Sequence, residues 1–197
     1  YGRLLKPLAT GLAAAGMDVT IFSTQPFYGA VGRQTRLPIR SREDGVRVIR
    51  SRWIGSRGQR QLVRLSADLA FVVALAWHLM IRKRYDLVTV STSPPVAAAL
   101  AVRLVSRIRG STMIYHCQDL HPEAAIAGGV LKRNRLAKLL QCLDSWTCAR
   151  AERVVVLSAD MRDGLAQRGL GTGNVTVLQN FIVPAPPNTD VTEIGWK

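Results

Sequence analysis

One short stretch, from Met113 to Ala125, brings together side chains that can move protons, orient sugars or bind a metal ion. Its sequence, MIYHCQDLHPEAA, passes from an apolar run into two histidines, a cysteine, two carboxylates, a glutamine and a proline. The burial of a hydrophobic core does not require such a mixture. We expect His116 and Asp119 to be the catalytic residues, because an imidazole can orient a hydroxyl group and stabilise charge in a water-poor cleft. Asp119 either steers an acceptor or holds the loop that bears the histidine.

A metal site is the weaker interpretation of this stretch. His116 and His121 have four residues between them, a spacing that pairs ligands only on a continuous helix, and Pro122 favours a turn. The three cysteines of the chain do not form the close pairs of a zinc site. Glu123, directly after Pro122, also fits the ordinary start of a helix. We therefore predict that the protein binds no metal.

Strand-like and helix-like segments alternate along the chain, and this order predicts how the cluster is held. Apolar segments rich in β-branched residues predict strands over 18–24, 45–54, 86–91, 111–116, 153–158 and 174–180. Helical periodicity predicts helices over 4–15, 62–81, 94–109, 135–150 and 159–168. Such alternation is typical of a parallel sheet covered by helices on both faces. The sequence therefore predicts an α/β, Rossmann-like doubly wound fold.

The apolar pattern also predicts which parts of these elements are buried. Segments 86–90 and 153–157 are nearly all apolar, as strands buried on both faces should be. Cys142 and Cys148 lie in the helical segment 135–150 and are expected to be small core residues. In the same segment one stripe is expected to face the core, formed by Leu136, Leu139, Leu140, Leu143 and Trp146.

Hydroxyl groups follow two of the predicted strands. In a doubly wound sheet ligands bind at the carboxyl ends of the strands, so these side chains are candidate ligand contacts. Ser91, Thr92 and Ser93 precede two prolines, and hydroxyls and free amides at a helix start can hold an anion or a sugar hydroxyl. We expect these three residues and Glu123 to bind an acceptor; simple helix capping is the alternative. Ser158 occupies a similar position, and an N-cap is the alternative there as well.

The chain is strongly basic, with 27 Lys and Arg residues against 13 Asp and Glu and a formal charge of +14. Such an excess favours a polyanionic partner. The basic residues are spread out, without interleaved aromatic residues or a nucleic-acid-binding motif, so we do not expect nucleic acid as a partner. A membrane surface or a phosphate-bearing ligand fits the composition better.

Segment 65–81 contains the apolar run LAFVVALAW. This uninterrupted run is roughly half of the about 20 apolar residues that a membrane span requires. The segment is therefore expected to be either a packed helix of the fold or a helix lying in a membrane interface. Basic residues on both sides suit anionic headgroups and lipid diphosphates and favour the second interpretation. They are Arg60, Arg64, Arg82, Lys83 and Arg84.

Six stretches of the sequence resemble family 4 glycosyltransferases, in the order in which that family has them. They are GLAAAGMDVTIFST, DGVRVIR, YDLVTVSTSPPVAAALAVRL, YHCQDLHPEAA, AERVVVLSADMRDGLAQRG and NVTVLQNF. The similarity covers nearly the whole chain and is greatest to the bacterial subgroup that builds O-antigen, capsule and exopolysaccharide repeat units. That subgroup has Asp-Leu, an aromatic residue and Pro-Glu or Pro-Asp at one strand end. Residues 119–123 match this motif, except that His121 replaces the aromatic residue.

The resemblance implies one lobe of a two-lobed GT-B enzyme. Residues 1–183 correspond to its N-terminal, acceptor-side lobe, with the first strand expected before Tyr1 and missing from the chain. The Pro-rich residues 184–197 correspond to a hinge or linker towards an absent donor-binding lobe. The implied reaction is retaining transfer of a sugar from a nucleotide-sugar donor to a lipid-diphosphate-linked saccharide. No cofactor is implied apart from this donor, which is a substrate.

The resemblance also implies roles for individual residues. His116 matches a position that contacts the donor sugar near the reacting centre. Gly2 matches the glycine-rich loop near the donor phosphates, where only glycine lets backbone approach so closely. Asn180 is retained from the hinge turn and, with Ser158, completes the expected donor contacts. An enzyme of this kind is expected in the cytoplasm, peripheral on the inner face of the plasma membrane. Another GT-B enzyme such as a nucleotide-sugar epimerase, or a non-catalytic polyanion-binding module, is the alternative.

Overall fold

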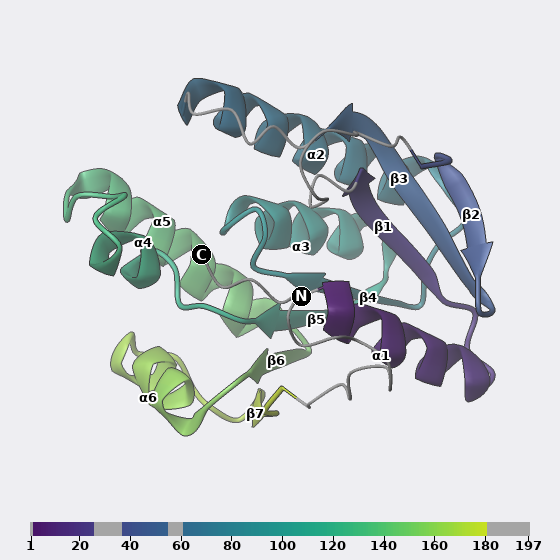
Figure 1. Ribbon diagram of the computed structural model, residues 1–197. Helices are drawn as coiled ribbons and strands as arrows, with labels where there is room; N and C mark the ends of the chain where they lie inside the picture. Colours follow the sequence, from purple (N-terminus) through teal and green to yellow (C-terminus); the bar gives the residue numbers. More distant parts are fainter. Residues whose placement is uncertain (1, 26–36, 55–60, 181–197) are drawn as a thin grey trace, which may run out of the picture.

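The computed structural model describes residues 2–25, 37–54 and 61–180 (Figure 1). The predicted domain boundary at residue 183, the linker 184–197 and Arg60 lie outside these described residues. The helices are α1 Gly2–Ala14, α2 Gln61–Ile81, α3 Ala97–Arg109, α4 Glu123–Ala127, α5 Arg135–Arg150 and α6 Ala159–Gln167. The strands are β1 Thr20–Gln25, β2 Arg40–Glu43, β3 Val46–Ile54, β4 Leu87–Ser91, β5 Thr112–Cys117, β6 Arg153–Val156 and β7 Val175–Val177.

The predicted α/β, Rossmann-like class is confirmed, with parallel strands and helices in alternation. Within the described residues the strands form two sheets. One has the order β1-β3-β2, in which β3 is parallel to β1 and antiparallel to β2. The other has the order β4-β5-β6-β7 and is parallel throughout. Because parallel strands end at the same edge of a sheet, the loops after β4, β5, β6 and β7 are neighbours.

The position of β4 corrects one burial prediction. Val154 and Val156 of β6 are fully buried, as the apolar pattern predicts, but Leu87 of β4 is 51% exposed and Thr89 is also exposed. The reason is topological: β6 has a neighbour on each side, whereas β4 pairs only with β5 among the strands that the structure describes. An all-apolar strand sequence therefore does not by itself place a strand in the centre of a sheet.

The main core lies between the parallel sheet and the helices that cover it. Figure 1 shows α3 between α2 and the strands β4 and β5, and residues from these elements share one hydrophobic cluster. Small residues such as Ala98 and Ala99 let α3 approach closely. Cys148 is buried in this cluster as predicted, but Cys142 is exposed, so that prediction is wrong for Cys142. Both lie on α5, and only Cys148 is on its inner face.

Candidate active site

The strand-end loops bring the first group of predicted residues together. Ser91, at the end of β4, is the direct register partner of His116 in β5. Thr92 follows it and is buried, whereas Ser93 is exposed. The structure thus places Ser91 beside the histidine, with Thr92 and Ser93 next along the chain, at the edge where parallel sheets bind ligands.

His116 lies on the less buried face of β5. Burial alternates along the strand, with Met113, Tyr115 and Cys117 buried on one face and His116 half-buried on the other. Burial lowers the pKa of His116 below its ordinary value of 6.5. At neutral pH the side chain is therefore an uncharged imidazole, which can both donate and accept a hydrogen bond.

Asp119 is exposed, two residues beyond the end of β5. Its backbone is held close to the strand, because the Cys117 thiol donates to the carbonyl of Asp119 over 3.3 Å. Burial raises the pKa of Cys117 to about 12, so the group remains a thiol and not a nucleophilic thiolate. The Asp119 side chain is therefore exposed to solvent on a loop whose backbone is held to the strand, within a few residues of His116.

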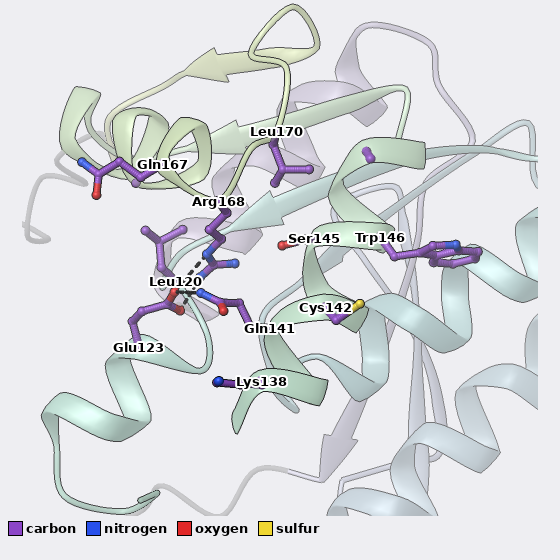
Figure 2. A pocket seen from close by; sticks show the side chains of 12 residues that line it. Leu120, Glu123, Lys138, Gln141, Cys142, Ser145, Trp146, Gln167, Arg168 and Leu170 are labelled. Carbon is purple, nitrogen blue, oxygen red and sulfur yellow. Dashed lines mark hydrogen bonds and ion pairs between the residues drawn. The ribbon is translucent and has the colours of Figure 1, made fainter. Parts of the chain in front are cut away.

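Glu123, predicted to bind an acceptor, takes part in a network of ion pairs and hydrogen bonds. Figure 2 shows Arg168 and Gln141 converging on its carboxylate. Arg168 Nε donates to Glu123 Oε1 over 3.0 Å and Arg168 Nη2 forms a second, shorter contact with Oε2. Gln141 Nε2 donates to the same Oε1 over 2.7 Å. Glu123 therefore ties α4 to α5 and α6, and its role at an acceptor remains a prediction.

The sequence analysis did not identify Arg168 or its second partner, Asp144. Arg168 Nη1 donates to Asp144 Oδ2 over 2.8 Å, and the two side chains are only 4% and 1% exposed. Tyr115 donates its hydroxyl to Asp144 Oδ1 over 3.0 Å. Burial raises the pKa of Asp144, whereas Arg168 and Tyr115 oppose that shift. No local spacing indicates a pair separated by 24 residues, so only the three-dimensional structure reveals it.

The donor-side candidates occupy separate places. Ser158 is the N-cap of α6, where its hydroxyl accepts from the amide of Met161 over 3.3 Å, so the capping alternative is observed. Asn180 is exposed, three residues beyond β7 and at the same sheet edge as the other loops. Gly2 begins α1, which packs against β3 of the smaller sheet. Donor contacts by these three residues remain predictions.

An open hollow of about 720 Å³ lies beside the Arg168 network, between α5, α6 and the loop after β5 (Figure 2). Leu120, Gln141 and Ser145 contribute to its lining. Among the residues that the structure describes, no group of three or more His, Cys, Asp and Glu side chains is arranged to hold a metal ion. The predicted site residues at the strand ends supply an imidazole, a carboxylate and hydroxyl groups.

Comparison with known proteins places this arrangement in a family. The family described as "Glycosyl transferase 4-like domain" matches residues 1–180. The protein named "Putative colanic acid biosynthesis glycosyl transferase WcaI", from Escherichia coli (strain K12), is 23% identical over 188 residues. That match covers 91% of the chain and 46% of the relative, so the chain spans about half the length of this curated relative. With the strand-end residues in the order of the motif and nearly the whole chain matched, the protein belongs to the glycosyl transferase 4-like domain family.

Proposed function

We propose that the chain is the acceptor-side lobe of a retaining glycosyltransferase of bacterial surface polysaccharide biosynthesis. The observation that supports this most is the placement of His116 beside Ser91, with the exposed Asp119 on the next loop, in a chain of the glycosyl transferase 4-like family. The donor is a nucleotide-sugar and the acceptor a lipid-diphosphate-linked saccharide. The relative's name, which refers to colanic acid biosynthesis, supports a polysaccharide product.

The chemistry assigned to these residues is hydrogen bonding and charge stabilisation. In the proposed reaction the bond from the sugar C1 to the diphosphate oxygen breaks and a bond from C1 to the acceptor oxygen forms. The nucleoside diphosphate leaves with the bonding electron pair and receives the acceptor hydroxyl proton. His116, neutral because burial lowers its pKa, hydrogen-bonds a donor sugar hydroxyl. Asp119 accepts a hydrogen bond from the acceptor hydroxyl and so orients it for attack.

We propose in addition that donor binding is completed by a second lobe outside these 197 residues. The resemblance assigns this chain to the acceptor-side lobe and donor binding mainly to the other lobe. The isolated chain should therefore bind a UDP-sugar weakly. Calorimetry that shows tight binding of a UDP-sugar by the isolated chain would overturn this division of labour.

The catalytic proposal is tested in the full-length natural protein with labelled nucleotide-sugars and a purified lipid-diphosphate-linked acceptor. His116→Ala should lower turnover by about 10²-fold or more while the fold stays intact. Asp119→Asn should also lower turnover, whereas Asp18→Asn, at an exposed carboxylate that pairs with Arg47, should not. Near-normal turnover of His116→Ala would refute the assignment.

The same enzyme is proposed to work at the inner face of the plasma membrane, bound through α2. The stretch Val63–Ile81 is long and apolar enough by length and composition to cross a membrane. Its inner face, however, contributes Leu75 and Leu79 to the main core, and α2 packs against α3. On its outer face an apolar stripe at four-residue spacing is 56–66% exposed, formed by Leu65, Leu69, Val73 and Trp77.

Charge around the stripe favours an anionic lipid surface over a protein partner. Arg82, Lys83 and Arg84 directly follow α2 and are all exposed, and Arg64 lies exposed in its first turns. Basic residues near a membrane surface contribute about 1 kcal/mol each towards binding anionic lipid. A helix with one face in the core, one apolar face exposed and cations at its ends is suited to lie in the interface rather than to span the bilayer.

Co-sedimentation with vesicles of increasing phosphatidylglycerol content tests the membrane proposal. Binding should increase with phosphatidylglycerol, decrease with salt and fall when Arg82, Lys83 and Arg84 are neutralised together. Neutralising three exposed cations elsewhere, Lys132, Arg133 and Arg135, is the matched control. Insertion of the apolar stripe should leave a salt-resistant remainder. If duplex DNA strips the protein from anionic vesicles and neutral vesicles never bind it, the membrane proposal is wrong.

A further inference from the structure

Arg168 connects four parts of the fold through one buried guanidinium group. The side chain follows α6 and is 4% exposed. It donates to the carboxylate of Glu123 on α4, to the carboxylate of Asp144 on α5, and to the backbone carbonyl of His121 over 3.0 Å. A planar guanidinium presents its donors in a rigid fork, so it can fix several partners relative to one another.

The bond to the His121 carbonyl is the unusual one. This residue belongs to residues 119–122, the last four before α4, and each of these four carbonyls accepts a hydrogen bond. Three of these bonds are local, from the Cys117 thiol and the amides of Ala124 and Ile126. Only the His121 carbonyl is held by a distant residue, Arg168, which is 47 positions away. Arg168 is therefore the long-range tether of this segment.

The tether is anchored on the strand that bears the candidate histidine. Arg168 is held by Asp144, and Asp144 accepts the hydroxyl of Tyr115 over 3.0 Å. Tyr115 immediately precedes His116 in β5 and is completely buried. A continuous series of bonds thus runs from β5 through α5 and the end of α6 to the loop that carries Asp119.

Charge makes this arrangement sensitive to Arg168. One guanidinium faces two carboxylates, Glu123 and Asp144. Without it, two negative groups remain in a site that is shielded from solvent on the Asp144 side, where the side chain is 1% exposed, and open on the Glu123 side, where it is 42% exposed. Like charges in such a site repel strongly, and at least one of them must move towards water. Asp144 is the more buried of the two, so α4 with Glu123 and the attached loop is the part free to move.

We propose that Arg168 is a positioning residue, which holds the segment 119–122 and Glu123 so that Asp119 keeps its position relative to His116 when the acceptor binds. This role rests on the proposed function, in which Asp119 orients the acceptor hydroxyl. It assigns no contact between Arg168 and a substrate. A loosened segment weakens acceptor binding but leaves the donor contacts unchanged.

Arg168→Lys tests the role while keeping a positive charge at the site. A lysine ammonium is a compact point charge and does not reproduce the three-way fork. Arg162→Lys is the matched control, because Arg162 lies on the same helix, is exposed and pairs with the adjacent Asp163. Asp144→Asn is the second variant, since it loosens Arg168 from its anchor with little change in side-chain volume.

Two measurements are made on each variant. In the 197-residue chain, Arg168→Lys should speed amide exchange in the segment 119–124 by about tenfold, with the β5 and β6 amides unchanged. In the full-length natural protein, it should raise the acceptor KM by about tenfold with the donor KM little changed, and it should also lower the Tm, because buried hydrogen bonds between charged groups are lost. Asp144→Asn should produce the same pattern to a smaller extent, and Arg162→Lys should produce neither change.

The outcomes separate this role from the proposed function. If Arg168→Lys leaves exchange in the segment unchanged, or speeds it equally throughout the chain, Arg168 has only a general structural role. If exchange in the segment accelerates but the acceptor KM stays at the wild-type value, the positioning role is wrong while the transferase proposal stands. If the wild-type protein transfers no sugar, the proposed function fails, and faster exchange confined to the segment still establishes the tether.

Discussion

The hydrogen bond between Tyr115 and Asp144 yields a quantitative prediction. Tyr115→Phe removes one hydroxyl from a completely buried side chain and leaves the ring in place. The lost bond spans 3.0 Å and ends on a carboxylate that is 1% exposed. Burial and the neighbouring Asp144 raise the pKa of Tyr115 far above its ordinary value, so the wild-type hydroxyl stays protonated and donates.

The magnitude follows from the chemistry of the acceptor. A hydrogen bond to a charged group contributes about 1.5–3 kcal/mol, and Arg168 still compensates the charge of Asp144 in the variant. We expect the free energy of unfolding to fall by about 2 kcal/mol, which corresponds to about 4–8 °C in Tm for a chain of this size. Urea denaturation followed by circular dichroism measures this change.

Tyr85→Phe provides the matched control, because Tyr85 also loses one hydroxyl bond. Its partner is His78 Nε2, at 2.9 Å, and burial lowers the pKa of His78 so that this partner is uncharged. A bond between neutral groups contributes about 1 kcal/mol. If Tyr115→Phe costs no more than Tyr85→Phe, Asp144 does not act as a charged acceptor and the reasoning is refuted.

Three further predictions concern stability. Burial lowers the pKa of His78 and of His116, so the unfolded chain binds more protons than the folded chain. The stabilisation from this source is complete above about pH 6.5, and it declines at lower pH until the folded-state pKa values are reached. A urea midpoint that does not fall between about pH 7 and 5 would contradict this sign. Gly110→Ala should cost about 1 kcal/mol in the same titration, because Gly110 ends α3 with a φ of 68°. Ser158→Ala should cost about 1 kcal/mol through loss of the α6 cap, and an unchanged donor KM would leave Ser158 with capping alone.

The sequence predicted most elements because their signals are local. Helical periodicity and Gly110 after the last turn identified α3, and β-branched runs identified β4 to β6. Short elements carry too few residues for periodicity, so β2, with the sequence RSRE, and the five-residue α4 were not predicted as elements. Long elements were therefore easier to predict than short ones.

Burial on α5 shows where the apolar pattern fails. The predicted inner stripe is wrong at Leu136 and Leu139, which are 52% and 55% exposed. The buried face instead includes Asp144 and Thr147, two polar residues. Asp144 is tolerated there because Tyr115 and Arg168 satisfy it, and neither partner is close to it in sequence. A buried polar network therefore places polar residues where the apolar pattern predicts apolar ones, and the partners that satisfy them come from distant parts of the chain.

The candidate site was predictable to the extent that it depends on strand ends. His116 and Ser91 meet because two parallel strands end together, which the fold class implies. The engagement of Glu123 by Arg168 was not predictable, because the two residues are 45 positions apart and belong to different helical units. Spacing motifs find residues that share one loop, and they do not find residues that join different loops.

The free side of β4 among the described strands bears on how the 197-residue chain behaves in concentrated solution. Within the described residues β4 pairs only with β5, and Leu87 on this strand is half exposed. Such an edge is a template for pairing with another chain, which leads to aggregation. The net charge of +14 keeps copies apart, but at physiological ionic strength screening confines that repulsion to about 8 Å. We therefore expect added salt, the common remedy when a basic protein adheres to nucleic acid, to increase self-association of this chain.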